Sequence, residues 1–128
     1  MKKYTLSTLL FCFAFSSSAA DTTEGCEEAD SGRYSAIAEC GYSSFKKVDA
    51  AVESTYKDLF QALREDEPTQ KLLVESQAAW KLSRDKTCDI WHSMISHQVS
   101  WCQYGMTEAR LTQLKHMHAC FTIGGNEC

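Results

Sequence analysis

The chain has 128 residues, of which 44% are hydrophobic and 23% are charged, and its formal net charge is −4. This length predicts one domain, and no uninterrupted apolar run is long enough to cross a membrane. The composition excludes a collagen-like or a disordered chain, so the seven cysteines are its unusual feature.

Residues 1–20 have the pattern of a secretory signal peptide. Two lysines precede a short apolar stretch, and small residues up to Ala20 form a cleavage site before Asp21. Cys12 lies inside the apolar stretch without a small residue before it, so we interpret it as part of the peptide and not as a lipid attachment site. Cleavage would leave a single domain over residues 21–128.

The mature chain would carry 11 basic and 17 acidic side chains, a net charge of −6. Nucleic-acid binding needs clustered lysine and arginine, so this balance argues against a nucleic-acid partner. The same charge favours encounter with a basic protein. We expect a periplasmic or secreted protein that has no membrane association after cleavage of the signal peptide.

Six cysteines would remain in the mature chain. An even number in a small exported protein is typical of a disulfide framework. The sequence has no Cys-x-x-Cys pair, which disfavours a structural zinc site. The expected disulfide cysteines are Cys26, Cys40, Cys88, Cys102, Cys120 and Cys128.

Apolar residues recur at steps of three and four over residues 37–63, which predicts one face of a long helix. Gly41 is expected to kink this helix or to delay its start. Pro68 suits the first turn of a second helix, with Asp66 or Glu67 as its cap.

The second helix is predicted to have an inner face that consists of Leu72, Leu73, Ser76, Ala79, Trp80, Ser83, Thr87, Ile90, Trp91 and Met94. A third helix is expected to begin or continue at residues 107–110, and residues 122–126 read as a turn-rich tail. No stretch alternates with a period of two. The predicted fold is therefore all-α, a small disulfide-stapled bundle of about three helices on a long antiparallel helical hairpin.

Antiparallel packing across a reversal near Asp66 pairs residues whose numbers sum to about 132. Asp49 then faces Arg84, and Tyr56 faces Gln77. We predict that Asp49 and Arg84 form a buried bidentate ion pair that sets the helix register, and not a catalytic pair. Among the 15 possible cysteine connectivities, the same rule favours Cys40–Cys88 and Cys26–Cys102. Cys120–Cys128 then closes a local loop.

The second helix contains the spacing Gln-x-x-Trp-x-x-x-Arg-Asp-x-x-Cys, which ends at Cys88. This spacing resembles the hallmark of the LprI-type domain family, which takes its name from a lysozyme inhibitor. The resemblance extends from Cys26 to Lys115. Its motif positions here are Asp49, Tyr56, Gln77, Trp80, Arg84, Asp85, Thr107 and Arg110, together with the early cysteines.

The resemblance implies a helical, exported inhibitor of lysozyme or of a related muramidase. Trp80, at helical spacing, is expected to be a core anchor. Family members usually carry a Gly-Gly-Ser/Thr loop between the third and fourth cysteines, whereas residues 91–100 contain no glycine. The stretch from Cys120 to Cys128 also lies outside the family pattern.

The histidines do not form a metal-ligand pattern. His116, His118 and Cys120 follow one another at two-residue steps, which point to different faces of a helix. His92 and His97 are five residues apart and fail in the same way. We expect neither a metal site nor a cofactor.

No catalytic motif is found, because the sequence lacks Gly-x-Ser-x-Gly and every mature cysteine has a probable disulfide partner. We therefore expect no catalytic residue and no enzyme; a hydrolase that uses Asp49 or Asp85 is disfavoured. The preferred function is inhibition of a basic partner such as lysozyme or another muramidase. Alternatives are an immunity protein against a periplasm-targeted toxin and a structural envelope protein. The candidate contact is the acidic corner, defined as Glu65, Asp66 and Glu67, with residues 91–100 as its rival.

Overall fold

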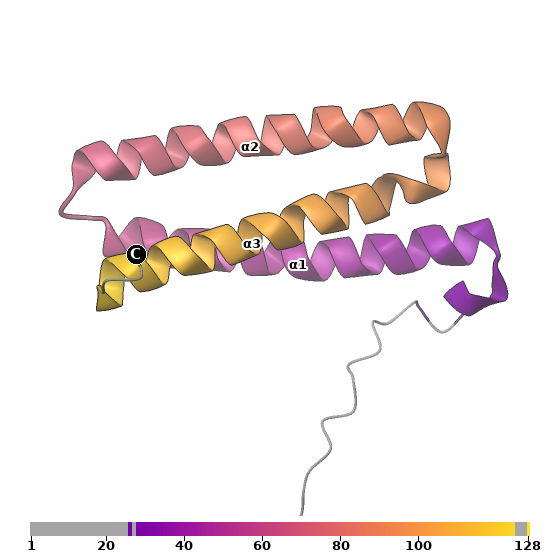
Figure 1. Cartoon of the computed structure of the whole chain (residues 1–128), viewed down its shortest axis with the longest axis horizontal. Helices are drawn as coiled ribbons and strands as arrows, with labels where there is room; N and C mark the ends of the chain where they lie inside the picture. Colours follow the sequence, from indigo (N-terminus) through magenta and orange to yellow (C-terminus); the bar gives the residue numbers. More distant parts are fainter. Residues whose placement is uncertain (1–25, 27, 125–127) are drawn as a thin grey trace, which may run out of the picture.

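The computed structural model describes residues 26, 28–124 and 128 as three long helices (Figure 1). The predicted signal peptide, Cys12 and the cleavage site before Asp21 lie outside these residues. The described elements are η1 (Ala29–Ser31), α1 (Tyr34–Ala62), α2 (Glu67–Met94), η2 (Ser96–Gln98) and α3 (Val99–Ile123). This part of the chain contains no strand, which confirms the all-α prediction. None of its helices is long and apolar enough to cross a membrane.

α1 begins at Tyr34 and runs through Gly41 as a continuous helix, so the predicted kink or delayed start at Gly41 is wrong. The glycine instead makes room for α3. A Cβ atom at Gly41 would lie 3.0 Å from both Cδ1 and Nε1 of Trp101. The same indole nitrogen donates a hydrogen bond of 3.0 Å to the carbonyl oxygen of Ile37. The missing side chain therefore allows a close approach between α1 and α3.

In the corner between α1 and α2, the residues that were expected to begin α2 do so. The carboxylate of Asp66 accepts a hydrogen bond of 3.2 Å from the backbone N–H of Thr69, and Pro68 lies in the first turn. The cap satisfies one N–H group that has no partner inside the helix.

α3 begins at Val99, so residues 107–110 continue this helix and do not begin it, which is the second of the two expected alternatives. Residues 91–100 contain the end of α2, the short η2 helix and the start of α3, so they form a tight corner in place of a glycine loop. At its other end α3 includes Thr122 and Ile123, which the sequence had placed in the tail. Gly124 ends it with a φ of 68° and donates its N–H to the carbonyl oxygen of Cys120.

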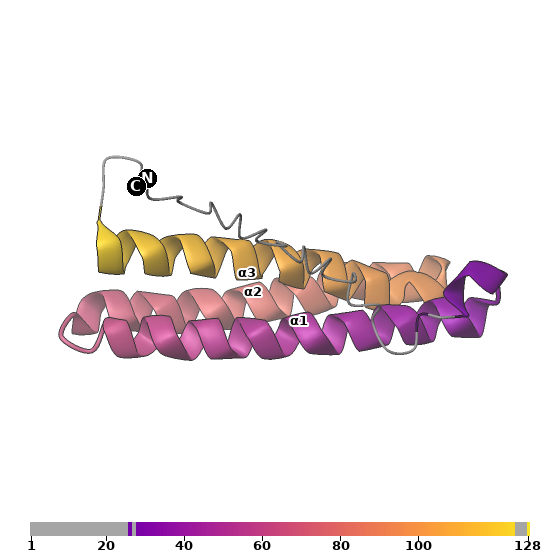
Figure 2. The same ribbon diagram turned by 90° about the horizontal axis from the view of Figure 1, so that it is seen from below.

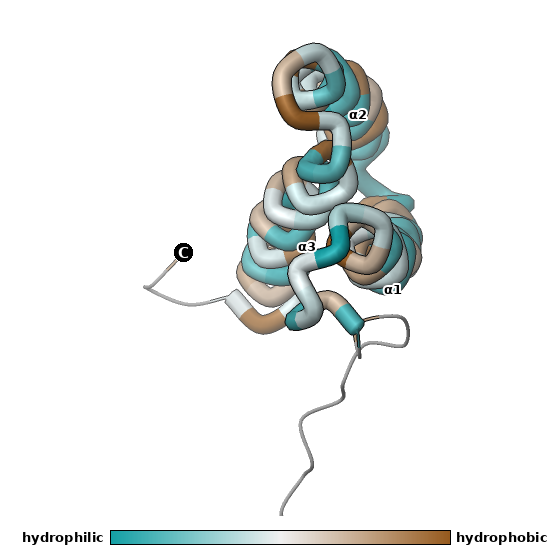
Figure 3. Tube along the Cα trace, turned by 90° about the vertical axis from the view of Figure 1, so that its right-hand side faces the viewer, coloured by the Kyte–Doolittle hydropathy of each residue, from teal (hydrophilic) through white to brown (hydrophobic). Residues whose placement is uncertain are grey.

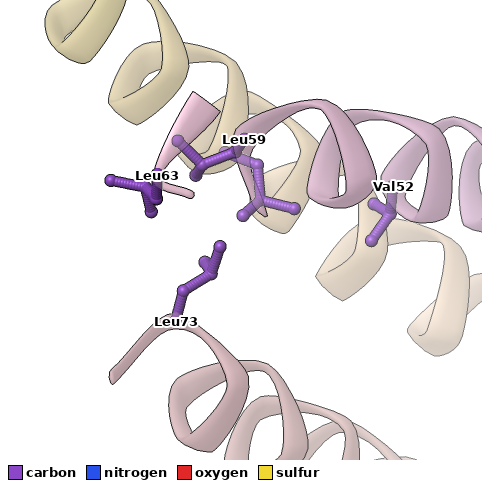
Figure 4. Close-up of a cluster of buried hydrophobic side chains, with 5 residues drawn as sticks. Val52, Leu59, Leu63 and Leu73 are labelled. Carbon is purple, nitrogen blue, oxygen red and sulfur yellow. The ribbon is translucent and has the colours of Figure 1, made fainter. Parts of the chain in front are cut away.

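The three helices run along one long axis, and α3 packs most closely on α1 (Figures 1 and 2). The end-on view shows α2 above the other two helices (Figure 3). Apolar side chains from all three helices form the core. These are Val52 and Leu59 of α1, Leu63 directly after α1, Leu73 of α2 and Leu114 of α3, and Figure 4 shows Leu73 pointing toward Leu59 and Leu63.

Two of the three predicted disulfide pairings are wrong. Cys26 is bonded to Cys40, and Cys88 is bonded to Cys102; each pair is separated by 14 residues. The pairing rule placed the first two helices face to face over their whole length. The early start of α3 instead brings Cys102 beside Cys88, and the arm before α1 returns Cys26 to Cys40. Cys120 is bonded to Cys128, the predicted pair.

Candidate functional site

Arg84 lies between the three helices and is buried. Its Nη1 donates to the carboxylate of Asp49 at 2.9 Å and to the hydroxyl of Thr107 at 3.4 Å. Its Nε donates to the carboxylate of Asp85 at 2.9 Å. The predicted pairing of Asp49 with Arg84 is present, but the guanidinium divides its donors between two carboxylates, so the bidentate geometry is wrong. Arg84 thereby ties α2 to α1 and to α3.

Arg110 of α3 is equally buried, and the acceptors of its hydrogen bonds are neutral side chains. Its Nε donates to Gln77 at 3.0 Å, its Nη1 to Gln113 at 2.6 Å and its Nη2 to Ser76 at 2.9 Å. Burial lowers the pKa of this guanidinium below its usual range. Three neutral oxygen atoms thus hold the cation, and two of them belong to α2.

Trp80 lies beside both cations. The guanidinium carbon of Arg84 is 4.9 Å from the indole ring and that of Arg110 is 5.7 Å from it. Phe45 of α1 provides a second ring, 5.2 Å from the carbon of Arg84. The indole is partly buried and packs against the apolar core, as expected of a core anchor, and it also forms a platform for the two arginines.

Tyr56 and Gln77 also depart from the predicted pairing. The amide oxygen of Gln77 is bound to Arg110, whereas Tyr56 packs against the core and lies 6.2 Å from the ring of Phe60. The amide nitrogen of Gln77 is buried and has no hydrogen-bond partner among the described residues.

All the motif positions except Tyr56 therefore form one polar cluster between the helices, together with Ser76 and Gln113. We define the polar cluster as Asp49, Ser76, Gln77, Trp80, Arg84, Asp85, Thr107, Arg110 and Gln113. This polar cluster joins all three helices. Its arginines are engaged by side chains of the same chain, and its tryptophan is stacked on both. We interpret these contacts as the ones that position α2 in the bundle, and not as a reaction centre.

Two of the histidines considered as metal ligands contact single side chains of the same chain. His116 lies 3.6 Å from the sulfur of Cys120, a cysteine that is bonded to Cys128. His97 stacks on Tyr34 with ring centres 4.4 Å apart. Within the described residues, no group of three or more histidine, cysteine or acidic side chains is placed to hold a metal ion.

The acidic corner has local structural roles. Glu65 forms an ion pair with Arg64 at 3.2 Å, and both side chains are highly exposed. Asp66 caps α2 and Glu67 lies in the first turn of that helix, where negative charge is favourable. These contacts leave the corner on the surface, at the end of the molecule where α1 ends and α2 begins (Figure 1).

The rival contact, residues 91–100, lies at the opposite end (Figure 1). Two disulfides close this end, and we call it the disulfide-bonded end. It exposes Tyr34, Tyr42 and Ile95, which are 69%, 56% and 40% exposed. Tyrosine is common in protein interfaces because one end of the ring is apolar and the other is polar.

A family model described as "Lysozyme inhibitor LprI" matches residues 26–114. The chain belongs to this family. The match includes the polar cluster, the acidic corner and the first two disulfides of the LprI domain, and it ends before the Cys120–Cys128 bond. Comparison with curated proteins gives no match, and comparison with solved structures gives none either.

One surface was not identified by the sequence reasoning. The predicted inner face of the second helix included Leu72, Ile90 and Met94, but these side chains are 64%, 60% and 70% exposed. The side that α2 buries carries Leu73, Gln77, Arg84 and Cys88. A count of apolar residues selects the wrong side because the contacts of α2 with the bundle are largely polar.

Proposed function

We propose that this protein is an exported inhibitor of lysozyme or of a related muramidase, and that it binds its target without cleaving anything. The observation that carries the proposal is the family match over residues 26–114. The disulfides support export, because such bonds persist in oxidising compartments.

The architecture suits inhibition by occlusion. A muramidase places two carboxylates in a cleft that binds a polysaccharide, and a rigid protein end inserted there would exclude the substrate. Two disulfides restrain the arm before α1 and the corner between α2 and α3. A surface that is already ordered loses less conformational entropy on binding, which favours affinity.

We propose the disulfide-bonded end as the main contact surface. It is restrained and offers exposed tyrosines, whereas the acidic corner is occupied in part by its own ion pair and helix cap. Tyrosine side chains of this kind are frequent among residues that dominate binding energy. The acidic corner stays the second candidate contact.

Charge is expected to contribute modestly to this binding. The mature chain would carry a net charge of −6, opposite in sign to the charge of a basic enzyme. Attraction to a basic enzyme acts mainly on the association rate and is screened by salt. Inhibition should therefore weaken slightly as the ionic strength rises.

The test is an inhibition assay with the purified mature protein and lysozymes of the c type and the g type. Tyr34→Ala combined with Ile95→Ala removes one exposed ring and one exposed aliphatic side chain from the disulfide-bonded end. Glu65→Gln combined with Glu67→Gln removes two of the three negative charges of the acidic corner and leaves the Asp66 cap intact. We expect the first pair to weaken inhibition at least tenfold and the second pair to slow association only. If excess protein slows neither lysozyme at low salt, the proposal fails.

A further inference from the structure

The exposed face of α2 carries an uncharged line of side chains that we call the α2 stripe. Its members follow one another at steps of four and three residues, the spacing of one helix face. All of them are exposed. They are Leu72, Ser76, Ala79, Ser83, Thr87, Ile90 and Met94, a line about 33 Å long at the rise of an α-helix.

A groove lies beside this stripe, between α2 and α3. Three successive hollows of about 510, 440 and 460 Å³ follow the two helices from the α2 start to the α2 end. The α2 wall includes Ser76, Trp80 and Thr87. The α3 wall repeats the same helical steps with uncharged side chains: Cys102, Met106, Ala109, Gln113, Met117 and Cys120. We call this surface the α2–α3 groove.

The lining of these hollows contains no lysine, aspartate or glutamate. Its single cation is Arg110, whose N–H groups are bound to Gln77, Gln113 and Ser76. The other wall of α2 carries charge, for example Lys81, which pairs with Glu53 of α1. An uncharged groove beside an uncharged helical stripe matches a second amphipathic helix.

We propose that the α2–α3 groove is the interface of a homodimer, in which α2 of each copy lies in the groove of the other. The stripe and the groove belong to the same chain, so a twofold axis covers both at once. With the axis at Ser83, Leu72 faces the partner's Met94 and Ala79 faces the partner's Thr87. Small side chains at the centre let the two helices approach closely, and large ones at the ends close the interface.

The available area suits a stable dimer. Leu72, Ile90 and Met94 of the stripe, with Trp91 and Phe121 of the groove lining, are between 40% and 70% exposed. Large side chains carry on the order of 200 Å² each, so these five offer about 570 Å². The small residues of the stripe and the groove walls add to this, toward the roughly 800 Å² per partner that specific interfaces bury.

The proposal does not depend on inhibition of lysozyme, because it is argued from the α2 stripe and the α2–α3 groove, which overlap residues 91–100 only around the end of α2. Its test is sedimentation equilibrium of the oxidised mature protein at concentrations up to about 1 mM, where even a millimolar Kd is visible. We expect a dimer. Ser83→Glu places two carboxylates against each other at the axis and should raise the dimer Kd at least 100-fold. Ser54→Glu, on an exposed position of α1, is the matched control and should leave the Kd unchanged.

A second variant tests whether Ser83 lies at the twofold axis, and its expected result is a new bond and not a loss of association. Ser83→Cys should form an intermolecular disulfide with its counterpart under mild oxidation, whereas Ser54→Cys should not. Circular dichroism of each variant checks that the helices are retained. A parent that stays monomeric at about 1 mM overturns the proposal, as does a dimer that Ser83→Glu leaves intact.

Discussion

The contact between α1 and α3 differs in kind from the contacts that hold α2. Val52 of α1 and Leu114 of α3 are fully buried, and the backbone of α1 approaches Trp101 at Gly41. α2 buries four residues, and of these only Leu73 and Cys88 are apolar. The α1–α3 pair is thus stabilised by apolar burial, whereas α2 is positioned by arginine networks and a disulfide.

The difference shows that a helix with a regular apolar pattern need not direct that pattern into its own core. Each buried arginine on the α2 contact must keep its hydrogen-bond partners, because an unpaired buried charge is costly. Such contacts fix geometry well but add little net stability. We therefore expect α2 to be the less stable region, and the predictions below test this from the largest effect to the smallest.

Replacement of Leu114 by alanine should give the largest loss of stability. The side chain is fully buried against α1, so its removal leaves a cavity and should cost about 4 kcal/mol of unfolding free energy. Leu82→Ala on the exposed side of α2 is the matched control and should change stability by less than about 0.5 kcal/mol. Urea denaturation measures both. Equal losses would mean that the outer face of α2 is covered within the monomer.

Removal of the Cys88–Cys102 disulfide should cost about 3 kcal/mol, the value expected for a loop of this length. Cys26–Cys40 has the same separation of 14 residues and provides a matched comparison. Hydrogen exchange should distinguish the effects of removing the two disulfides. Loss of the first bond should increase exchange in the second half of α2, and loss of the other should affect only the arm before α1. Slow exchange in α2 without its disulfide would show that polar contacts alone retain it.

Arg84→Ala should cost about 2 kcal/mol, because it leaves Asp49 partly buried without its cation and removes a platform contact of Trp80. The double change Arg84→Met with Asp49→Leu should recover a large part of this loss, since apolar pairs of similar volume often replace buried ion pairs well. Thermal unfolding of the two variants gives the comparison. If the Arg84→Ala variant is as stable as the parent, the polar cluster does not hold α2 in the bundle.

The smallest expected effect is the change in unfolding free energy when either of two helical glycines is replaced by alanine. Gly41→Ala should lower stability by about 1 kcal/mol even though alanine favours helices, because Trp101 would have to move away from α1. Gly105→Ala on α3 meets no atom within 4 Å and should raise stability by up to about 1 kcal/mol. If chemical denaturation shows changes in unfolding free energy of opposite sign for the two variants, the close approach of α1 and α3 is confirmed. A stabilising Gly41→Ala would contradict it.

Helix periodicity predicted the fold class, and the α2 cap at Asp66 was anticipated from the residue types near Pro68. The family spacing identified the residues of the polar cluster except Ser76 and Gln113, and antiparallel arithmetic correctly placed Asp49 against Arg84. These features depend on local spacing along one or two helices. The start of α3 and two disulfide partners were missed, because they depend on how α3 meets the rest of the chain.

The sequence by itself therefore determined that the chain is helical, that its cysteines pair and that it carries the LprI family motif. Only the tertiary structure decided which face of α2 meets the bundle, which cysteines meet, and that an uncharged groove lies between α2 and α3. The reason is physical. Periodicity records which side chains share one face of a helix, but the partner of that face depends on close contacts such as Trp101 at Gly41, which join residues 60 positions apart.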